Sequence, residues 1–190
     1  GLLKSNSRDN LKLGISFTTR TKRKNETEGK DYFFISKEEF QEKLQQNNLL
    51  EHANVFGNLY GTGKKWVNEQ TRKGTNLILE LDFQGALQVK DLYAEAILIF
   101  ILPPSLQDLK TRLEERALDS PEVINNRLKE AKKEIDHSQK FNFTLVNQEF
   151  NESLKDLEDI IINNLMLSEA KIKLAQKTLK FLVEEGERIE

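Results

Sequence analysis

Two arginines, Arg20 and Arg23, lie within the segment 16–23, whose sequence is SFTTRTKR. A guanidinium group is planar, and its N–H donors form a fork that matches the oxygens of a phosphate group. The segment also carries lysine and several hydroxyl side chains. These residue types predict a phosphate-binding site. A solvated basic turn is the alternative, because most clusters of surface charge bind nothing.

The chain as a whole is not basic, so a phosphate site must be local. Its 190 residues include 29 Lys and Arg against 31 Asp and Glu, which gives a net charge of −2. We therefore expect no nucleic-acid partner. The chain has no cysteine, and its two histidines, His52 and His137, are far apart, so we expect no zinc site. The lack of cysteine is compatible with the reducing cytoplasm, where we expect the protein to lie.

Apolar residues come in short runs. The longest run, 96–102, has the length of a strand and falls far short of the ~20 residues that cross a bilayer. The N-terminal residues also lack the apolar stretch of a secretory signal. We therefore expect a soluble protein that has no membrane partner.

Strands and helices are predicted to alternate. Apolar and β-branched segments predict strands at 12–17, 31–35, 49–56, 76–81, 96–102 and 143–147. Ser36 and Glu39 predict a capping box at a helix start, and Ser105 and Ser120 predict two further starts. Gly74 predicts the end of a helix that begins near residue 64.

The segment from 151 to the end repeats leucine and isoleucine at three- and four-residue steps. This pattern predicts one long helix or two helices with an apolar stripe. We expect the stripe to pack on its own domain. A homodimer contact through the C-terminal helix is the alternative.

A series of specific motifs runs along the chain. They are S-x-T-T-R-x-x-R at 16–23, G-K-D-Y-x-F at 29–34, L-L-E-H-A at 49–53, G-N-L-Y-G-T at 57–62, L-E-L-D-F-Q-G-A at 79–86, I-F-I-L-P-P-S at 99–105, R-L-x-x-R at 112–116, R-L-K-E-A at 127–131 and L-V-N at 145–147. In order and spacing these motifs resemble guanylate kinases, which transfer a phosphoryl group from ATP to GMP.

The resemblance implies an α/β fold of the P-loop-kinase type, in which helices flank a parallel sheet. A small mixed α/β lobe would bind GMP, and a helical lid would close over the phosphates. The chain would be a single domain, 1–190. Its parts are then the core at 1–17, 76–110 and 140–190, the GMP-binding lobe at 18–75 and the lid at 111–139.

The resemblance also implies which residues bind GMP. Arg20 and Arg23 would hold the phosphate group, with Arg23 also catalytic, and the hydroxyl groups of Tyr32 and Tyr60 would donate to the same oxygens. Taken alone, each tyrosine is more simply explained as an amphipathic residue with a buried ring. The remaining residues implied in GMP binding are Ser16, Glu51, Gly61, Thr62, Glu80 and Asp82.

Glu51 is the candidate for guanine recognition. Guanine presents N1–H and an exocyclic amine side by side, so one carboxylate can accept from both and discriminate against adenine. The alternative is an exposed strand residue. Glu80 and Asp82 lie at the end of the strand predicted at 76–81, at the position where open α/β sheets bind ligands.

For ATP, the resemblance implies residues in the second half of the chain. Arg116 and Arg127 match lid arginines that bind ATP and act in catalysis by neutralising charge on the transferring group. Asn147 matches a position near the adenine. Arg112 is either part of this group or a solvated helix charge. Mg²⁺ would accompany ATP, and we expect no metal site made by the protein alone.

One family motif does not occur in the 190 residues: the phosphate-binding loop G-x-x-x-x-G-K-[ST]. Residues 2–4 resemble the end of the helix that follows this loop, so the first strand and the loop are expected to be missing from this chain. Their absence favours a rival function, an inactive guanylate-kinase-like module that binds phosphorylated peptides. The complete set of guanine-side groups favours the enzyme. His52, Gly63 and the pair Ala117-Leu118 depart from the common pattern, and the last puts lid mobility in doubt.

Overall fold

The computed structural model describes residues 10–115 and 120–187. The chain divides into two compact units, one over Leu3–Ala96 and one over Ile97–Glu190. Each unit is described by itself. In the described residues, no helix combines the length and the apolar character that spanning a membrane requires.

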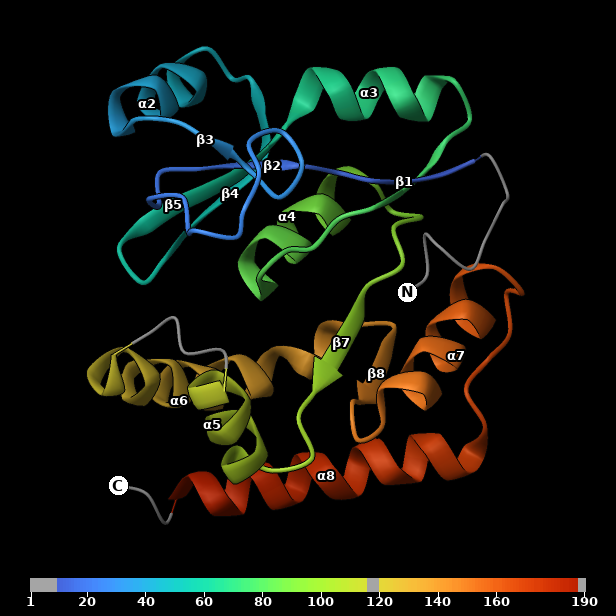
Figure 1. The fold of residues 1–190 in the computed structure, drawn as a ribbon. Coiled ribbons are helices and arrows are strands. Elements are labelled where there is room, and N and C mark those ends of the chain that lie inside the picture. The colour runs from blue at the N-terminus through green and yellow to red at the C-terminus, as the bar shows by residue number, and fades with distance from the viewer. Residues whose placement is uncertain (1–9, 116–119, 188–190) are drawn as a thin grey trace. The chain divides into compact units, whose positions relative to one another are not determined.

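The first unit contains a parallel pair of strands, β1 (Leu11–Leu13) and β6 (Asn76–Ile78). Helix α3 (Lys64–Arg72) precedes β6, and α4 (Phe83–Leu92) follows it (Figure 1). Leu50, Val67 and Val89 form the buried core of this region, and partly buried side chains of the β6 segment pack on it. The alternation of parallel strands and helices is that of an α/β fold.

The same unit contains a mixed four-stranded sheet in the order β3-β2-β5-β4. Its strands are β2 (Ser16–Thr18), β3 (Phe33–Phe34), β4 (Leu49–Val55) and β5 (Asn58–Gly63). β2 and β3 are parallel, while β5 is antiparallel to both β2 and β4. β5, which carries Gly61 and Thr62, therefore lies between the strands that carry Ser16 and Glu51.

β4 and β5 form a tight hairpin through Phe56 and Gly57. Both residues have positive φ, 50° and 77°, as a type I′ turn requires. The side chain of Asn54 accepts a hydrogen bond from the Gly57 N–H at 3.0 Å. This turn sets the register in which Ala53 of β4 lies opposite Tyr60 of β5.

Helix α2 (Lys37–Gln45) begins as the sequence predicts. Ser36 Oγ accepts a hydrogen bond from the Glu39 N–H at 3.1 Å. In turn, a carboxylate oxygen of Glu39 accepts from the Ser36 N–H at 2.7 Å. The predicted capping box is confirmed. Phe40, on the buried side of this helix, is fully enclosed.

The prediction of one strand over 12–17 is wrong, because β1 ends at Leu13 and β2 begins at Ser16. Gly14 lies at this break. Its N–H donates to the Ile78 carbonyl at 2.8 Å, and a Cβ there would lie 2.3 Å from Leu79 Cδ2. A side chain at Gly14 would therefore require the Leu79 side chain to move.

The sequence prediction also missed β5 and overestimated three other strands. β5 contains two glycines and an asparagine, which have low strand propensity. Pairing with a strand on each side overrides that propensity. The strands predicted at 31–35 and 76–81 are observed only over Phe33–Phe34 and Asn76–Ile78. The strand predicted at 96–102 is observed only over Ile99–Leu102.

The second unit is built on another parallel pair, β7 (Ile99–Leu102) and β8 (Phe143–Val146). Its helices are α5 (Leu106–Glu115), α6 (Pro121–Asp136), α7 (Phe150–Ile161) and α8 (Glu169–Glu187), with a short 3₁₀ helix at His137–Lys140. Ser105 and Ser120 lie at the starts of α5 and α6 and accept from backbone N–H groups, as predicted.

The C-terminal segment forms two helices, α7 and α8, which was one of the two predicted arrangements. Leu182 of α8 is fully buried in a core with Leu102, Leu106 and Ile135. Leu182 and Leu179 of the stripe thus pack within their own unit, as expected, whereas Leu165 and Ile172 are exposed. The homodimer contact stays a prediction.

Candidate active site

Ser16, Glu51 and Thr62 come together through strand register. Thr62 of β5 is paired with Ser16 of β2 on one side and with Glu51 of β4 on the other. Paired residues of adjacent strands project from the same face of a sheet, so the three side chains share one face. The Ser16 and Thr62 hydroxyl oxygens lie 3.0 Å apart, within hydrogen-bond distance.

The Glu51 side chain is buried, with only 3% of the residue surface exposed. Burial raises the pKa of its carboxyl group, and the nearby Asp82 charge adds to this effect, while hydrogen bonding to Thr62 opposes it. Oε1 is buried and has no hydrogen-bond partner among the described residues. An unsatisfied buried acceptor is costly, so a ligand that donates to Oε1 would stabilise the site. The alternative of an exposed strand residue is wrong.

Glu80 and Asp82 follow the carboxyl end of β6. Asp82 is the N-cap of α4, where its Oδ1 accepts from the Gly85 N–H at 2.9 Å. Glu80 is exposed and Asp82 half-buried. Both carboxylates are therefore at the sheet edge where α/β folds bind ligands.

Arg20 is held by a carboxylate that the sequence prediction missed. Its guanidinium makes two hydrogen bonds to Glu26, at 2.6 and 3.1 Å, and a third to the Thr21 carbonyl at 2.9 Å. The same carboxylate accepts from the Arg23 N–H at 2.7 Å. The hydrogen bond from Arg20 is the main reason that the pKa of Glu26 lies below its ordinary value. The geometry is that of an ordered turn and not of a freely solvated basic loop.

Two tyrosines accompany Arg20. The Arg20 guanidinium carbon lies 5.6 Å from the Tyr32 ring centroid, and the rings of Tyr32 and Tyr60 meet edge-on at 5.8 Å. Burial raises the pKa of the Tyr32 hydroxyl, and Tyr60 adds to the shift. Tyr60 lies two residues before Thr62 on β5, so it projects from the same face as the base-side groups.

In the second unit, Arg127 lies half-buried on α6, and Asn147 follows β8, where its N–H donates to the Leu102 carbonyl at 2.8 Å. Arg112 of α5 donates to the Asn147 carbonyl at 2.8 Å. This bond ties α5 to the end of β8, so Arg112 has a structural partner and is not merely a solvated helix charge. Arg116 and the Ala117-Leu118 pair lie outside the described residues.

A model of the guanylate kinase family matches residues 1–164. The chain belongs to the guanylate kinase family. A guanylate kinase from Clostridium tetani is 46% identical over 160 residues, which are 84% of this chain and 76% of that protein. One from Hahella chejuensis is 49% identical over 148 residues, 78% of this chain and 71% of that protein.

A solved structure of a family member agrees with the fold. The crystal structure of guanylate kinase from Anaplasma phagocytophilum matches with a TM-score of 0.71 at 34% sequence identity. The match covers 84% of this chain and 78% of that one.

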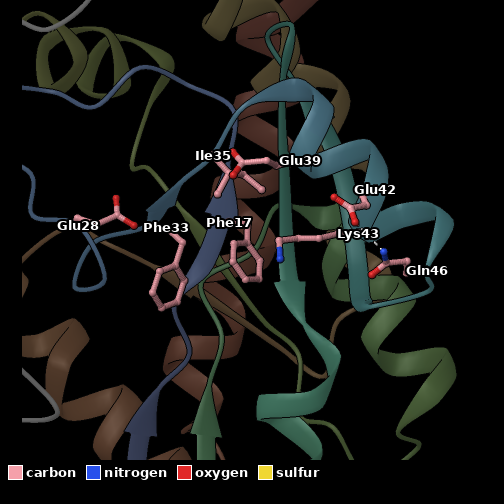
Figure 2. Close-up of a pocket in the computed structure, with 8 residues that line it drawn as sticks. All are labelled: Phe17, Glu28, Phe33, Ile35, Glu39, Glu42, Lys43 and Gln46. Carbon is pink, nitrogen blue, oxygen red and sulfur yellow. Dashed lines mark hydrogen bonds between the residues drawn. The ribbon is translucent and has the colours of Figure 1, made fainter.

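A separate hollow of about 270 Å³ lies between α2 and the mixed sheet. Figure 2 shows its aromatic side, Phe17 and Phe33, and the side chain of Lys43, whose Nζ lies 4.5 Å from the Phe17 ring centroid. Phe17 alternates with Ser16 and Thr18 along β2, so it projects from the opposite face. This hollow is therefore not the guanylate kinase base site.

Three residues near the site were not among the predicted site residues: Glu26, Gly85 and Gln88. Glu26 is six residues after Arg20. The presence of an acidic residue in an otherwise basic turn was the sequence feature that could have indicated this pair. Gly85 and Gln88 lie on α4, and both contact groups of β4, at Glu51 and His52 respectively. Nothing in local sequence indicates these long-range contacts.

Proposed function

We propose that this protein transfers the γ-phosphoryl group of ATP to GMP, giving ADP and GDP. Membership of the guanylate kinase family supports this activity. The observation that carries it is the buried Glu51 carboxylate, which keeps an open acceptor oxygen beside the Ser16 and Thr62 hydroxyls. Those groups complement the donor edge of guanine.

Guanine recognition then follows from hydrogen-bond chemistry. Glu51 accepts from N1–H and from the exocyclic amine, and Ser16, Gly61 and Thr62 complete the base site. Adenine offers no donor at the ring nitrogen, so AMP would leave the buried carboxylate oxygen unsatisfied. Sites that hydrogen-bond a substrate in this way reject an analogue that lacks the donor.

The GMP phosphate is bound by Arg20 and Arg23, with hydroxyl donors from Tyr32 and Tyr60. Arg20 is already oriented by Glu26 and by the Tyr32 ring, so little conformational freedom is lost when the phosphate binds. Glu80 and Asp82 complete the GMP side at the end of β6.

ATP contacts come from Arg116, Arg127 and Asn147. Phosphoryl transfer needs positioning and charge stabilisation more than covalent chemistry, so the arginines Arg23, Arg116 and Arg127 are the catalytic residues. We assign the core to 1–17, 76–110 and 140–190, the GMP lobe to 18–75 and the lid to 111–139.

Mg²⁺ is proposed to enter with ATP. The described residues contain no group of three or more His, Cys, Asp or Glu side chains that could hold a metal. Mg²⁺ commonly keeps several waters and binds through substrate phosphates and one or two carboxylates, and Glu80 and Asp82 are carboxylates of this kind. When bound with ATP near Glu80 and Asp82, the ion would supply positive charge that offsets the negative charge of the transferring phosphoryl group.

Neither the family matches nor the described residues favour the rival function, an inactive phosphopeptide-binding module. A phosphopeptide has no guanine edge to satisfy the buried Glu51 oxygen. A phosphopeptide would also make no use of the Ser16 and Thr62 hydroxyl groups beside that oxygen.

The test compares GMP with AMP. The full-length protein should form ADP and GDP from ATP and GMP, and calorimetry should show tighter binding of GMP than of AMP. Glu51→Gln replaces one acceptor oxygen with an amide donor and should weaken GMP binding by roughly 10- to 100-fold, a loss typical of one charged hydrogen bond. Equal affinities for GMP and AMP, or an unchanged preference in Glu51→Gln, would show the base-site assignment to be wrong.

A further inference from the structure

Gly85 lies in α4 directly against the Glu51 carboxylate. A Cβ built at Gly85 would be 2.5 Å from Glu51 Oε2, 3.2 Å from Glu51 Cδ and 3.2 Å from Asp82 Oδ1. Contacts below 3.0 Å do not persist, so any side chain at Gly85 would displace the carboxylate or the helix.

The helix itself does not require a glycine here. Gly85 is within the helical segment Phe83–Leu92 and has no positive φ. In such a position alanine is more favourable than glycine by about 1 kcal/mol. The benefit of glycine must therefore come from the space that it leaves.

Helix α4 and strand β4 cannot easily move apart to make room for a side chain at Gly85. Gln88, one turn after Gly85, accepts from the His52 N–H at 3.1 Å and donates to the His52 carbonyl at 2.8 Å. These two bonds fasten α4 to β4 at the residue next to Glu51. On the neighbouring strand, a Cβ at Gly61 would lie 2.9 Å from the Glu51 carbonyl oxygen, so the backbone of Glu51 is closely packed as well.

We propose that Gly85 is a positioning residue for guanine specificity. Its missing side chain creates the space that Oε2 of Glu51 occupies, and this placement leaves Oε1 open toward the base. Gln88 keeps that space constant by holding α4 on β4. The inference rests on the proposed function, because it assigns a role to the groups around the guanine carboxylate.

The first experiment is Gly85→Ala, measured by calorimetry with GMP and IMP and by thermal unfolding. IMP lacks the exocyclic amine, so the GMP to IMP affinity ratio reports whether Glu51 still reaches that group. Gly85→Ala should weaken GMP binding by roughly tenfold or more and bring the ratio close to one, as expected for a displaced charged acceptor. Wild-type affinity for GMP in a folded Gly85→Ala protein would overturn the proposal.

Gly74→Ala is the matched control. Gly74 has φ +73° and no atom within 4 Å of a built Cβ, so alanine there is strained but contacts nothing. This variant should lower the melting temperature and keep the GMP to IMP ratio of the wild type. The pair separates loss of stability from loss of positioning, and a changed ratio in Gly74→Ala would contradict a role specific to Gly85.

The second experiment combines Gly85→Ala with Glu51→Asp. Aspartate is one methylene shorter and withdraws from the added methyl group. The double variant should therefore bind GMP better than the product of the two single effects predicts. If Gly85→Ala does not fold, recovery of folding by Glu51→Asp supports the proposal, and failure to recover overturns it. A wild-type protein without preference for GMP would instead contradict the proposed function.

Discussion

Arg20 and Glu51, the two central residues of the proposed site, differ in their hydrogen bonding. The Arg20 guanidinium makes three hydrogen bonds, two to the Glu26 carboxylate and one to the Thr21 carbonyl. Glu51 is buried with one oxygen unsatisfied. In the proposed function, the GMP phosphate would therefore share Arg20 with Glu26, whereas guanine would supply the hydrogen-bond donor that Glu51 lacks.

The Arg20–Glu26 pair should make stability depend on pH. The pKa of Glu26 is below its ordinary value, chiefly because Arg20 donates to the charged form. Its contribution is therefore fully present above the ordinary carboxyl pKa, and it is lost as the pH falls through the lowered pKa. Urea unfolding of wild type and Glu26→Gln should show the wild type more stable at neutral pH, with the difference shrinking in acid. A difference that is constant from neutral pH to pH ~2 would show that the ion pair does not stabilise the turn.

At the scale of elements, the site depends on one hairpin and one helix. The tight β4–β5 hairpin sets the register that pairs Thr62 with Glu51. Helix α4 supplies Asp82 at its N-cap and Gly85 beside Glu51. Helix α2, by contrast, covers the opposite side of the sheet, where the separate hollow lies (Figure 2).

The α2 cap should therefore affect stability and not base recognition. Ser36→Ala removes the side-chain acceptor for the Glu39 N–H and should lower the free energy of unfolding by about 1 kcal/mol. Glu39→Gln keeps an oxygen for the Ser36 N–H and should be closer to wild type. Chemical denaturation with calorimetry on the same samples gives both quantities. A change in the GMP to AMP preference in Ser36→Ala would show that α2 is coupled to the base site.

At the scale of the whole molecule, the proposed GMP ligands fall in the first unit, and the proposed ATP residues fall in the second. Mutations in the two sets of residues should therefore affect GMP binding and the phosphoryl-transfer step separately. Groups that contact the GMP phosphate act in ground and transition states alike, whereas lid arginines engage the transferring group.

Arg20→Ala should mainly raise KM for GMP, because it removes binding that is equal in both states. Arg127→Ala should lower kcat by roughly 10² or more with little change in KM, as expected for a lost transition-state donor. Arg72→Ala, on the exposed end of α3, is the control and should leave both constants unchanged. Steady-state kinetics on the full-length protein decide the matter. Near-normal turnover of Arg127→Ala would remove it from the catalytic residues.

The sequence alone determined the family and much of the local structure. Ordered motifs from Ser16 to Asn147 indicated guanylate kinase, and the family match agrees. The starts of α2, α5 and α6 were predictable because capping is local chemistry between residues three apart. The types of residue at the candidate site were also predictable, since Arg, Tyr and Glu carry their donors and acceptors wherever they lie.

Tertiary structure alone decided how those residues are used. β5 is a strand because β2 and β4 pair with it, although its own residues have low strand propensity. The open oxygen of Glu51, the Glu26 partner of Arg20 and the space at Gly85 all arise from packing. For Glu51 and Gly85, that packing joins residues 34 positions apart in sequence. Burial and close approach depend on which segments meet in space, so no local pattern of residues encodes them.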